Sequence, residues 1–143
     1  MSKTEIVLAH PVRTPIAGYN GALKGTPATV LGAIVVRETL KRAGLDPAAL
    51  DAVVMGNVVQ AGNRMNPARQ ASIGGGVPVA VPALTVNRVC GSGAQAIVSA
   101  AQDIRAGDAS VAVAGGMENM DRAPYLVEGG RWGYRMGPAT MLD

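Results

Sequence analysis

The stretch that most constrains this chain is residues 83–107, where the only cysteine lies between a short apolar run and a long alanine-rich segment. The run at residues 83–86 is apolar and partly β-branched, which favours a strand. Glycines on both sides of Ser92 permit a sharp turn, and the segment after it predicts a helix that ends at Gly107. The sequence therefore places Cys90 at a strand-to-helix turn. Helix N-termini favour anions and lower the pKa of thiols, so this is a suitable place for a sulfur nucleophile.

Two other interpretations of this turn stay open on the residues alone. A lone cysteine is often a small buried apolar residue with no chemical role. Gly91, Gly93 and Ala96 also fit G-x-G-x-x-A, the fingerprint of dinucleotide-binding domains after a strand. The acidic residue that this fingerprint expects about 20 positions further on has only Glu118 as a candidate, beyond a Gly-Gly turn. The fingerprint by itself is weak evidence.

The rest of the chain predicts a layered α/β fold. Apolar runs predict further strands over residues 5–9, 52–55 and 111–114. Thr26-Pro27 and Asn66-Pro67 each place a capping side chain before a proline, and predict the starts of two more helices, the first ending at Gly44. This alternating order with short connections favours helices on both faces of one sheet.

Two further features qualify this expected fold. Small residues on most sides of the helix after Cys90 predict that it is buried between layers. From residue 121 to residue 141 glycine, proline and aromatic residues replace the alternation, which predicts an excursion from the sheet.

Composition excludes several classes of protein. The 143 residues suffice for one ordinary domain, and 48% hydrophobic against 16% charged residues indicate a folded chain. The net charge of +3 is scattered, and three Tyr, one Trp and no Phe give no stacking platform for nucleic acid. One cysteine allows no disulfide within the chain, which suits a reducing compartment. No signal peptide or membrane segment is visible, so we expect a cytoplasmic protein.

The motif Asn87-Arg88-Val89-Cys90-Gly91-Ser92-Gly93, followed by Gln95-Ala96-Ile97, closely resembles the nucleophile motif of the thiolases, the acetyl-CoA acyltransferases. Further matches follow the family's order along nearly the whole chain; they are Arg13-Thr14-Pro15, Gly56-Asn57-Val58, Asn66-Pro67-Ala68-Arg69-Gln70, Gly115-Gly116-Met117-Glu118-Asn119-Met120 and residues 131–137. Ala94, where many thiolases carry Leu, is a minor departure.

The resemblance implies a thiolase-like layered α-β-α half with a mixed sheet. Residues 1–120 correspond to an incomplete N-terminal domain, and residues 121–143 to the beginning of an inserted loop and tetramerisation region. In the family the closing strands of this half follow the insertion. We therefore expect an exposed sheet edge and an exposed apolar helix face.

The resemblance also implies the chemistry. Cys90 would carry the acyl group as a thioester, in Claisen condensation with acetyl-CoA or in thiolytic cleavage of 3-ketoacyl-CoA, with coenzyme A thioesters as substrates and with no cofactor or metal. The backbone N–H of Cys90 matches an oxyanion donor. Met136 matches a loop methionine that lines the pantetheine pocket of a neighbouring subunit, so a homo-oligomer, dimer or tetramer, is expected.

Other residues are expected to have supporting roles. The family's activating His and second Cys lie in its C-terminal half, and His10 matches no catalytic position, so we expect these residues alone to be inactive. We expect Asn87 and Arg88 to hold the turn by backbone hydrogen bonds and an ion pair, and Glu118 to be a structural carboxylate.

Two rival functions stay open. The chain could be a non-catalytic fragment or assembly module with an inert cysteine, or, less in keeping with the motif, a dinucleotide-binding domain. A ketoacyl synthase fits less well, because the Cys-Gly-Ser-Gly sequence is more similar to thiolases.

Overall fold

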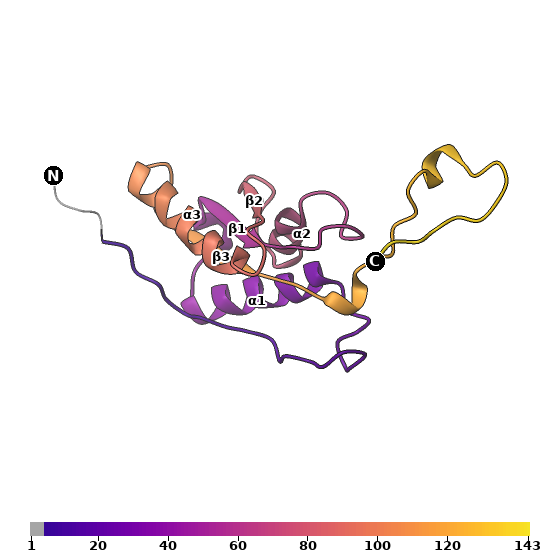
Figure 1. Ribbon diagram of the computed structural model, residues 1–143. Helices are drawn as coiled ribbons and strands as arrows, with labels where there is room; N and C mark the ends of the chain where they lie inside the picture. The colour runs from indigo at the N-terminus through magenta and orange to yellow at the C-terminus, as the bar shows by residue number, and fades with distance from the viewer. Residues whose placement is uncertain (1–4) are drawn as a thin grey trace.

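A computed structural model describes residues 5–143, and its centre is a small parallel sheet (Figure 1). The strands are β1 (Ala52–Gly56), β2 (Ala83–Val86) and β3 (Ala112–Gly116), in the order β2-β1-β3. In the register of the sheet, Val53 lies between Ala83 and Val113. The helices are α1 (Ala28–Ala43), α2 (Pro67–Gly74) and α3 (Ser92–Ala106), with short 3-10 turns at Pro47–Ala49, Met120–Arg122 and Gly130–Trp132. All strand pairs within the described residues are parallel, so the mixed sheet that the resemblance implies is not seen here.

Helices cover both faces of the sheet, as the sequence predicts (Figure 1). Val53 and Met55 of β1 belong to the main core together with side chains of α1 and α2, whereas Val54 packs with Ala96 and Ala100 of α3. Because successive side chains of a strand point to opposite faces, this alternation separates one layer of α1 and α2 from a second layer of α3. The strand β1 is buried on both sides, which explains its continuous apolar sequence.

Most of the expected helix boundaries are confirmed. Asn66 caps α2 by accepting a hydrogen bond from the backbone N–H of Arg69 at 3.1 Å, before a proline at the first position. Gly44 ends α1 in the left-handed region with φ of 61°. The expected cap at Thr26 is wrong, because the N-cap residue of α1 is Pro27 and its first helical residue is Ala28. The carbonyl of Pro27 accepts from the N–H groups of Val30 and Leu31, and no side chain caps this end.

The helix α3 is less buried than its small residues suggest. Only Ser92, Ala96 and Ala100 are buried, and these face the sheet. Val98 is exposed on the side away from the sheet, and Ile97 is partly exposed beside the edge of β3, since none of the described residues forms a second layer over α3. The expectation of a helix buried between layers is therefore wrong for the described residues, whereas the exposed apolar helix face is confirmed.

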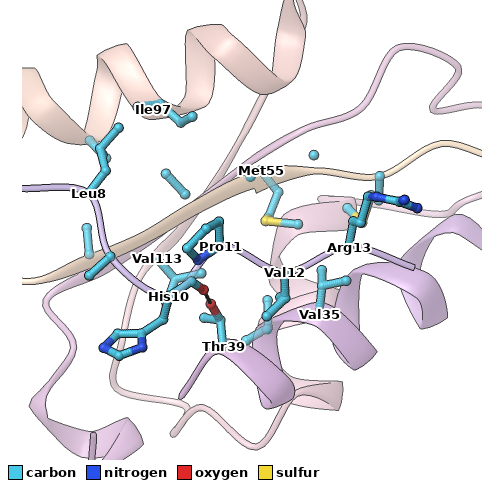
Figure 2. A pocket seen from close by; sticks show the side chains of 18 of the residues that line it. Leu8, His10, Pro11, Val12, Arg13, Val35, Thr39, Met55, Ile97 and Val113 are labelled. Carbon is cyan, nitrogen blue, oxygen red and sulfur yellow. Dashed lines mark hydrogen bonds between the residues drawn. The ribbon is translucent and has the colours of Figure 1, made fainter. Parts of the chain in front are cut away.

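The predicted strand at residues 5–9 is wrong. These residues form no strand, and they run as an extended, largely exposed segment past the outer edge of β3. An apolar groove of about 670 Å³ lies between the segment, β3 and the flanking faces of α1 and α3. Figure 2 shows the segment crossing this groove between Ile97 of α3 and Val35 and Thr39 of α1. The segment does not pair with β3, so a strand-forming sequence remains irregular, and the outer edge of β3 is unpaired among residues 5–143, as expected.

Residues 123–143 form an arm that projects from the body (Figure 1). Leu126 and Leu142 close its base by exchanging two backbone hydrogen bonds of 2.8 Å. The hydroxyl of Tyr134 donates to the carbonyl of Glu128 within it. The predicted excursion from the sheet is thus present, whereas the domain division at residue 120 stays a prediction.

Candidate active site

The cysteine turn lies at the carboxyl end of the sheet, where glycines let the start of α3 approach the strands closely. A Cβ atom on Gly56, the last residue of β1, would lie only 2.4 Å from the carbonyl carbon of Ser92 and 2.7 Å from the N of Gly93. A Cβ atom on Gly116, the last residue of β3, would lie 3.2 Å from the Cα of Gly93. Glycine is required at Gly56 because no side chain fits against this backbone. Two strand ends and one helix start therefore hold the position of the turn.

Ser92 ties the turn together from within. Its side chain is buried, with 4% of the residue exposed. Its Oγ accepts a hydrogen bond from the N–H of Arg88 at 2.8 Å and donates one to the carbonyl of Val89 at 2.6 Å. The N–H of Ser92 also donates to the carbonyl of Val89, at 3.0 Å. The hydroxyl of Ser92 thus connects the backbone on both sides of Val89, the residue before the cysteine.

Val89, directly before the cysteine, has a strained backbone. Its φ is +48°, a left-handed conformation that β-branched residues avoid. Such a conformation costs about 1–3 kcal/mol and persists only where the surrounding structure over-determines it. Strain of this kind clusters at functional sites, so it marks this turn as a place where a particular direction of the next side chain is held.

Cys90 itself is exposed and unpaired with any other sulfur, since it is the only cysteine. Asn87 holds the turn by backbone hydrogen bonds, as predicted: its Oδ1 accepts from Val89 N–H at 3.0 Å, and its Nδ2 donates to the carbonyl of Val58 at 3.1 Å. The predicted ion pair of Arg88 is wrong. Its guanidinium donates instead to the neutral Oε1 of Gln95 at 2.8 Å, one helical turn into α3.

Glu118 is half-buried and joins the loop after β3 to the loop after β1. Its Oε2 accepts from Val58 N–H at 2.7 Å, and its Oε1 accepts from the Nδ2 of the fully buried Asn57 at 2.9 Å. The structure therefore gives this carboxylate the supporting place that the sequence suggests. In a dinucleotide-binding domain it would be the residue for the ribose, but here its oxygens are occupied by donors of the chain itself.

The other candidate residues lie elsewhere. His10 lines the apolar groove beside β3, to which Cys90 does not contribute, and its carbonyl accepts a hydrogen bond from the hydroxyl of Thr39 (Figure 2). Met136 is 95% exposed on the projecting arm. The structure thus does not bring His10 or Met136 to Cys90 within one chain. Within residues 5–143 there is no group of three potential metal-ligating side chains, and no helix is long and apolar enough to cross a bilayer.

Sequence reasoning missed the roles of Ser92, Gly56 and Gly116. A usable signal was present, because β1 and β3 each end in a glycine at the level where the cysteine turn must pass. The strain at Val89 had no such signal, since valine is an improbable residue for a left-handed position.

A strained strand-to-helix turn that presents one side chain above the carboxyl end of a parallel sheet defines a class: an α/β domain with a nucleophile turn. The chain belongs to the thiolase family, because the family model "Thiolase, N-terminal domain" matches residues 6–143.

The relatives agree with this assignment. The chain is 50% identical over 139 residues to an acetyl-CoA acetyltransferase of Pseudomonas aeruginosa, covering 97% of this chain and 35% of that protein. It is 48% identical over 140 residues to an acetyl-CoA acetyltransferase of Cupriavidus necator, covering 98% of this chain and 36% of the relative. A probable acetyl-CoA acyltransferase of Staphylococcus epidermidis is 50% identical over 140 residues, with the same coverage. The chain therefore spans about a third of the length of these relatives.

Proposed function

We propose that this chain supplies the nucleophile of an acyl-CoA:acetyl-CoA C-acyltransferase. The Cys90 thiolate attacks the thioester carbonyl of an acyl-CoA, a new carbon–sulfur bond forms, and the sulfur of coenzyme A leaves and takes a proton. The carbanion of acetyl-CoA then displaces Cys90 and gives 3-ketoacyl-CoA; the reverse sequence cleaves 3-ketoacyl-CoA with free coenzyme A. Coenzyme A thioesters are substrates in this proposal, and no further cofactor is invoked.

One observation carries the proposal: an exposed thiol at a turn whose neighbouring backbone is held in a strained conformation. Cys90 precedes the first residue of α3 by two positions, and Ser92 connects the backbone on both sides of Val89. An inert core cysteine would be buried and would need no such turn. By the resemblance, the N–H of Cys90 is also one donor of the oxyanion hole that stabilises the tetrahedral intermediate.

Residues outside this chain complete the proposed site. The sequence has one His and one Cys, and His10 lines a groove to which Cys90 does not contribute. We propose that the base for Cys90 and the group that moves the α-proton of acetyl-CoA come from the part of the family's length that this chain does not span. These 143 residues alone are accordingly proposed to be inactive, in a cytoplasmic enzyme of fatty acid metabolism.

The arm supports a proposal about assembly. Trp132 and Met136 are 86% and 95% exposed, although tryptophan and methionine usually find partners in a folded protein. We propose that residues 121–143 begin the inserted loop region, that the arm contacts a second copy in a dimer or tetramer, and that Met136 lines the pantetheine pocket of that copy.

Steady-state kinetics test the activity on the whole native protein, meaning this chain together with the part of the enzyme that supplies the base and the group for the α-proton. Coenzyme A-dependent cleavage of acetoacetyl-CoA is expected, and Cys90→Ala is expected to remove it, because no other thiol in this chain can accept the acyl group. The matched control is Ser99→Ala, a small change on α3 away from the turn.

The exposed arm also favours the rival function of a non-catalytic assembly module. In that case acetoacetyl-CoA cleavage would be absent or indifferent to Cys90→Ala, whereas removal of the arm's apolar side chains would still disrupt assembly. The two functions are thus separated by one pair of variants.

A further inference from the structure

We infer that Glu118 is a positioning residue for Cys90, acting through Val58 and Asn87 on the backbone of the turn. The inference rests on the proposed function, in which Cys90 is the acyl-accepting nucleophile. Its starting point is a continuous path of hydrogen bonds. Glu118 Oε2 accepts from Val58 N–H at 2.7 Å, Val58 carbonyl accepts from Asn87 Nδ2 at 3.1 Å, and Asn87 Oδ1 accepts from Val89 N–H at 3.0 Å.

The first end of the path is fixed. Asn57, which has no exposed surface, donates from Nδ2 to Glu118 Oε1 at 2.9 Å and to the carbonyl of Met117 at 3.1 Å. The N–H of Met117 in turn donates to the carbonyl of Gly56 at 3.0 Å. The carboxylate is therefore anchored to the ends of both β1 and β3, which are hydrogen-bonded neighbours in the sheet.

The middle of the path is Val58, whose N–H and carbonyl belong to the two peptide units that meet at its Cα, and each of these two groups has a partner. The N–H of Val58 meets a carboxylate, and charge-assisted hydrogen bonds are the shorter and stronger ones. The peptide unit that carries the Val58 carbonyl also contains the N–H of Val59, which donates to Glu118 Oε1 at 3.4 Å, and hydrogen bonds at the two ends of one amide strengthen each other. The charge of Glu118 thus favours both the place and the acceptor strength of the carbonyl that holds Asn87.

The far end of the path is the strained residue. Val89 at φ +48° has its N–H bonded to Asn87 and its carbonyl bonded to the Oγ and N–H of Ser92. Ser92 holds the carbonyl of this residue, whereas Asn87 holds its N–H and is itself bonded to Val58 in another loop. The left-handed conformation is over-determined only while both are present. Because Val89 directly precedes Cys90, its φ and ψ set the direction of the thiol.

This role predicts a specific pattern of damage. Loss of the path leaves the thiol present but lets its direction vary, so a reaction that demands alignment suffers more than one that demands only a thiolate. Acyl transfer from acetyl-CoA is of the first kind and alkylation by iodoacetamide of the second. A residue that merely supported folding would lower both rates together, in proportion to the fraction of folded protein.

The experiment uses the whole native protein with Glu118→Gln, Asn87→Ala and both together. Glu118→Gln turns an NH₂ group toward one of the N–H donors, and Asn87→Ala is an exposed position whose loss leaves the core intact. The control is Asn119→Ala, next to Glu118, which loses bonds to the carbonyls of Leu23 and Thr26 but is not on the path.

Each single variant is expected to lower kcat for acyl transfer by about tenfold or more, with KM for acetyl-CoA nearly unchanged and the iodoacetamide rate at Cys90 changed far less. The double variant should be no slower than the worse single one, because both act along one path. Asn119→Ala should keep wild-type kcat.

Losses that multiply in the double variant, or acylation and alkylation rates that fall in parallel, would overturn the inference. Failure of the proposed function has a different signature: the wild-type protein itself would then form no acyl-Cys90.

Discussion

The turn around Cys90 and the arm of residues 123–143 are stabilised in opposite ways. The turn is made of small and polar residues, and every constraint on it comes from inside the chain: two strand ends, Ser92 and the path from Glu118. The arm carries most of the aromatic residues, yet few contacts from the described chain reach beyond its base at Leu126 and Leu142.

The difference shows which interactions fix the conformation of each part. Hydrogen bonds and close backbone contacts fix the direction of one side chain without any large apolar residue. Exposed apolar side chains gain free energy only when another surface covers them. The turn is therefore fixed by the chain itself, as the proposed site requires, whereas the arm is suited to contact something outside the described residues.

The largest predicted effect comes from filling the contact between β1 and α3. In Gly56→Ala the new Cβ would meet the backbone of Ser92 at 2.4 Å, and backbone cannot move aside as a flexible side chain can. We expect the free energy of unfolding to fall by roughly 3 kcal/mol or more, at the upper end of overpacking effects. Chemical denaturation measures this loss.

The control for this variant is Gly25→Ala, where no atom lies within 4 Å of the added Cβ atom and a change within about 0.5 kcal/mol is expected. Equal stability of the two variants would show that β1 and α3 do not approach as described.

A smaller loss is expected when the hydroxyl that ties the turn is removed. Ser92→Ala leaves the N–H of Arg88 without its partner in a part-buried position. Such an orphaned donor costs about 1–3 kcal/mol. Thermal unfolding measures the loss, and Ser99→Ala, whose hydroxyl only accepts from the Gln95 side chain on the same helix, should cost less. A Ser92→Ala protein as stable as the Ser99→Ala protein would contradict the claim that the Ser92 hydroxyl stabilises the turn.

The smallest effect on stability is expected in the arm. Trp132→Ser should change the free energy of unfolding by no more than about 0.5 kcal/mol at a protein concentration where copies are dissociated, as for other exposed positions. The same variant should weaken self-association in sedimentation velocity. Tyr19→Ser, an equally exposed aromatic outside the arm, should leave association unchanged. A large loss of monomer stability at Trp132 would place the arm against its own domain.

Most of the fold could be predicted because its signals are local. Asn66-Pro67 and Gly44 mark helix ends by the chemistry of single residues, and short apolar runs mark β1, β2 and β3. The segment at residues 5–9 has the composition of a strand, but a strand needs a neighbour to hydrogen-bond with, and composition cannot supply one. The helix α3 shows the same limit, because its small residues describe a packing partner that residues 5–143 do not provide.

In the candidate site, too, the local features could be predicted from the sequence and the long-range contacts could not. Cys90 was predictable from its glycines and from the motif around it, and Asn87 from its usual role in turns. The Arg88 guanidinium instead finds a neutral partner one turn into α3, which only the three-dimensional turn reveals. The path from Glu118 joins residues 60 positions apart through a backbone carbonyl and an N–H, and such groups leave no trace in the sequence.

The most direct measurement of the central claim is peptide mapping by mass spectrometry after the whole native protein is mixed with acetyl-CoA and quenched in acid. The account predicts one acetyl group on the peptide that contains Cys90, and its loss when free coenzyme A is added before the quench. An unmodified Cys90 peptide, in protein that nevertheless releases coenzyme A from acetyl-CoA, would contradict it.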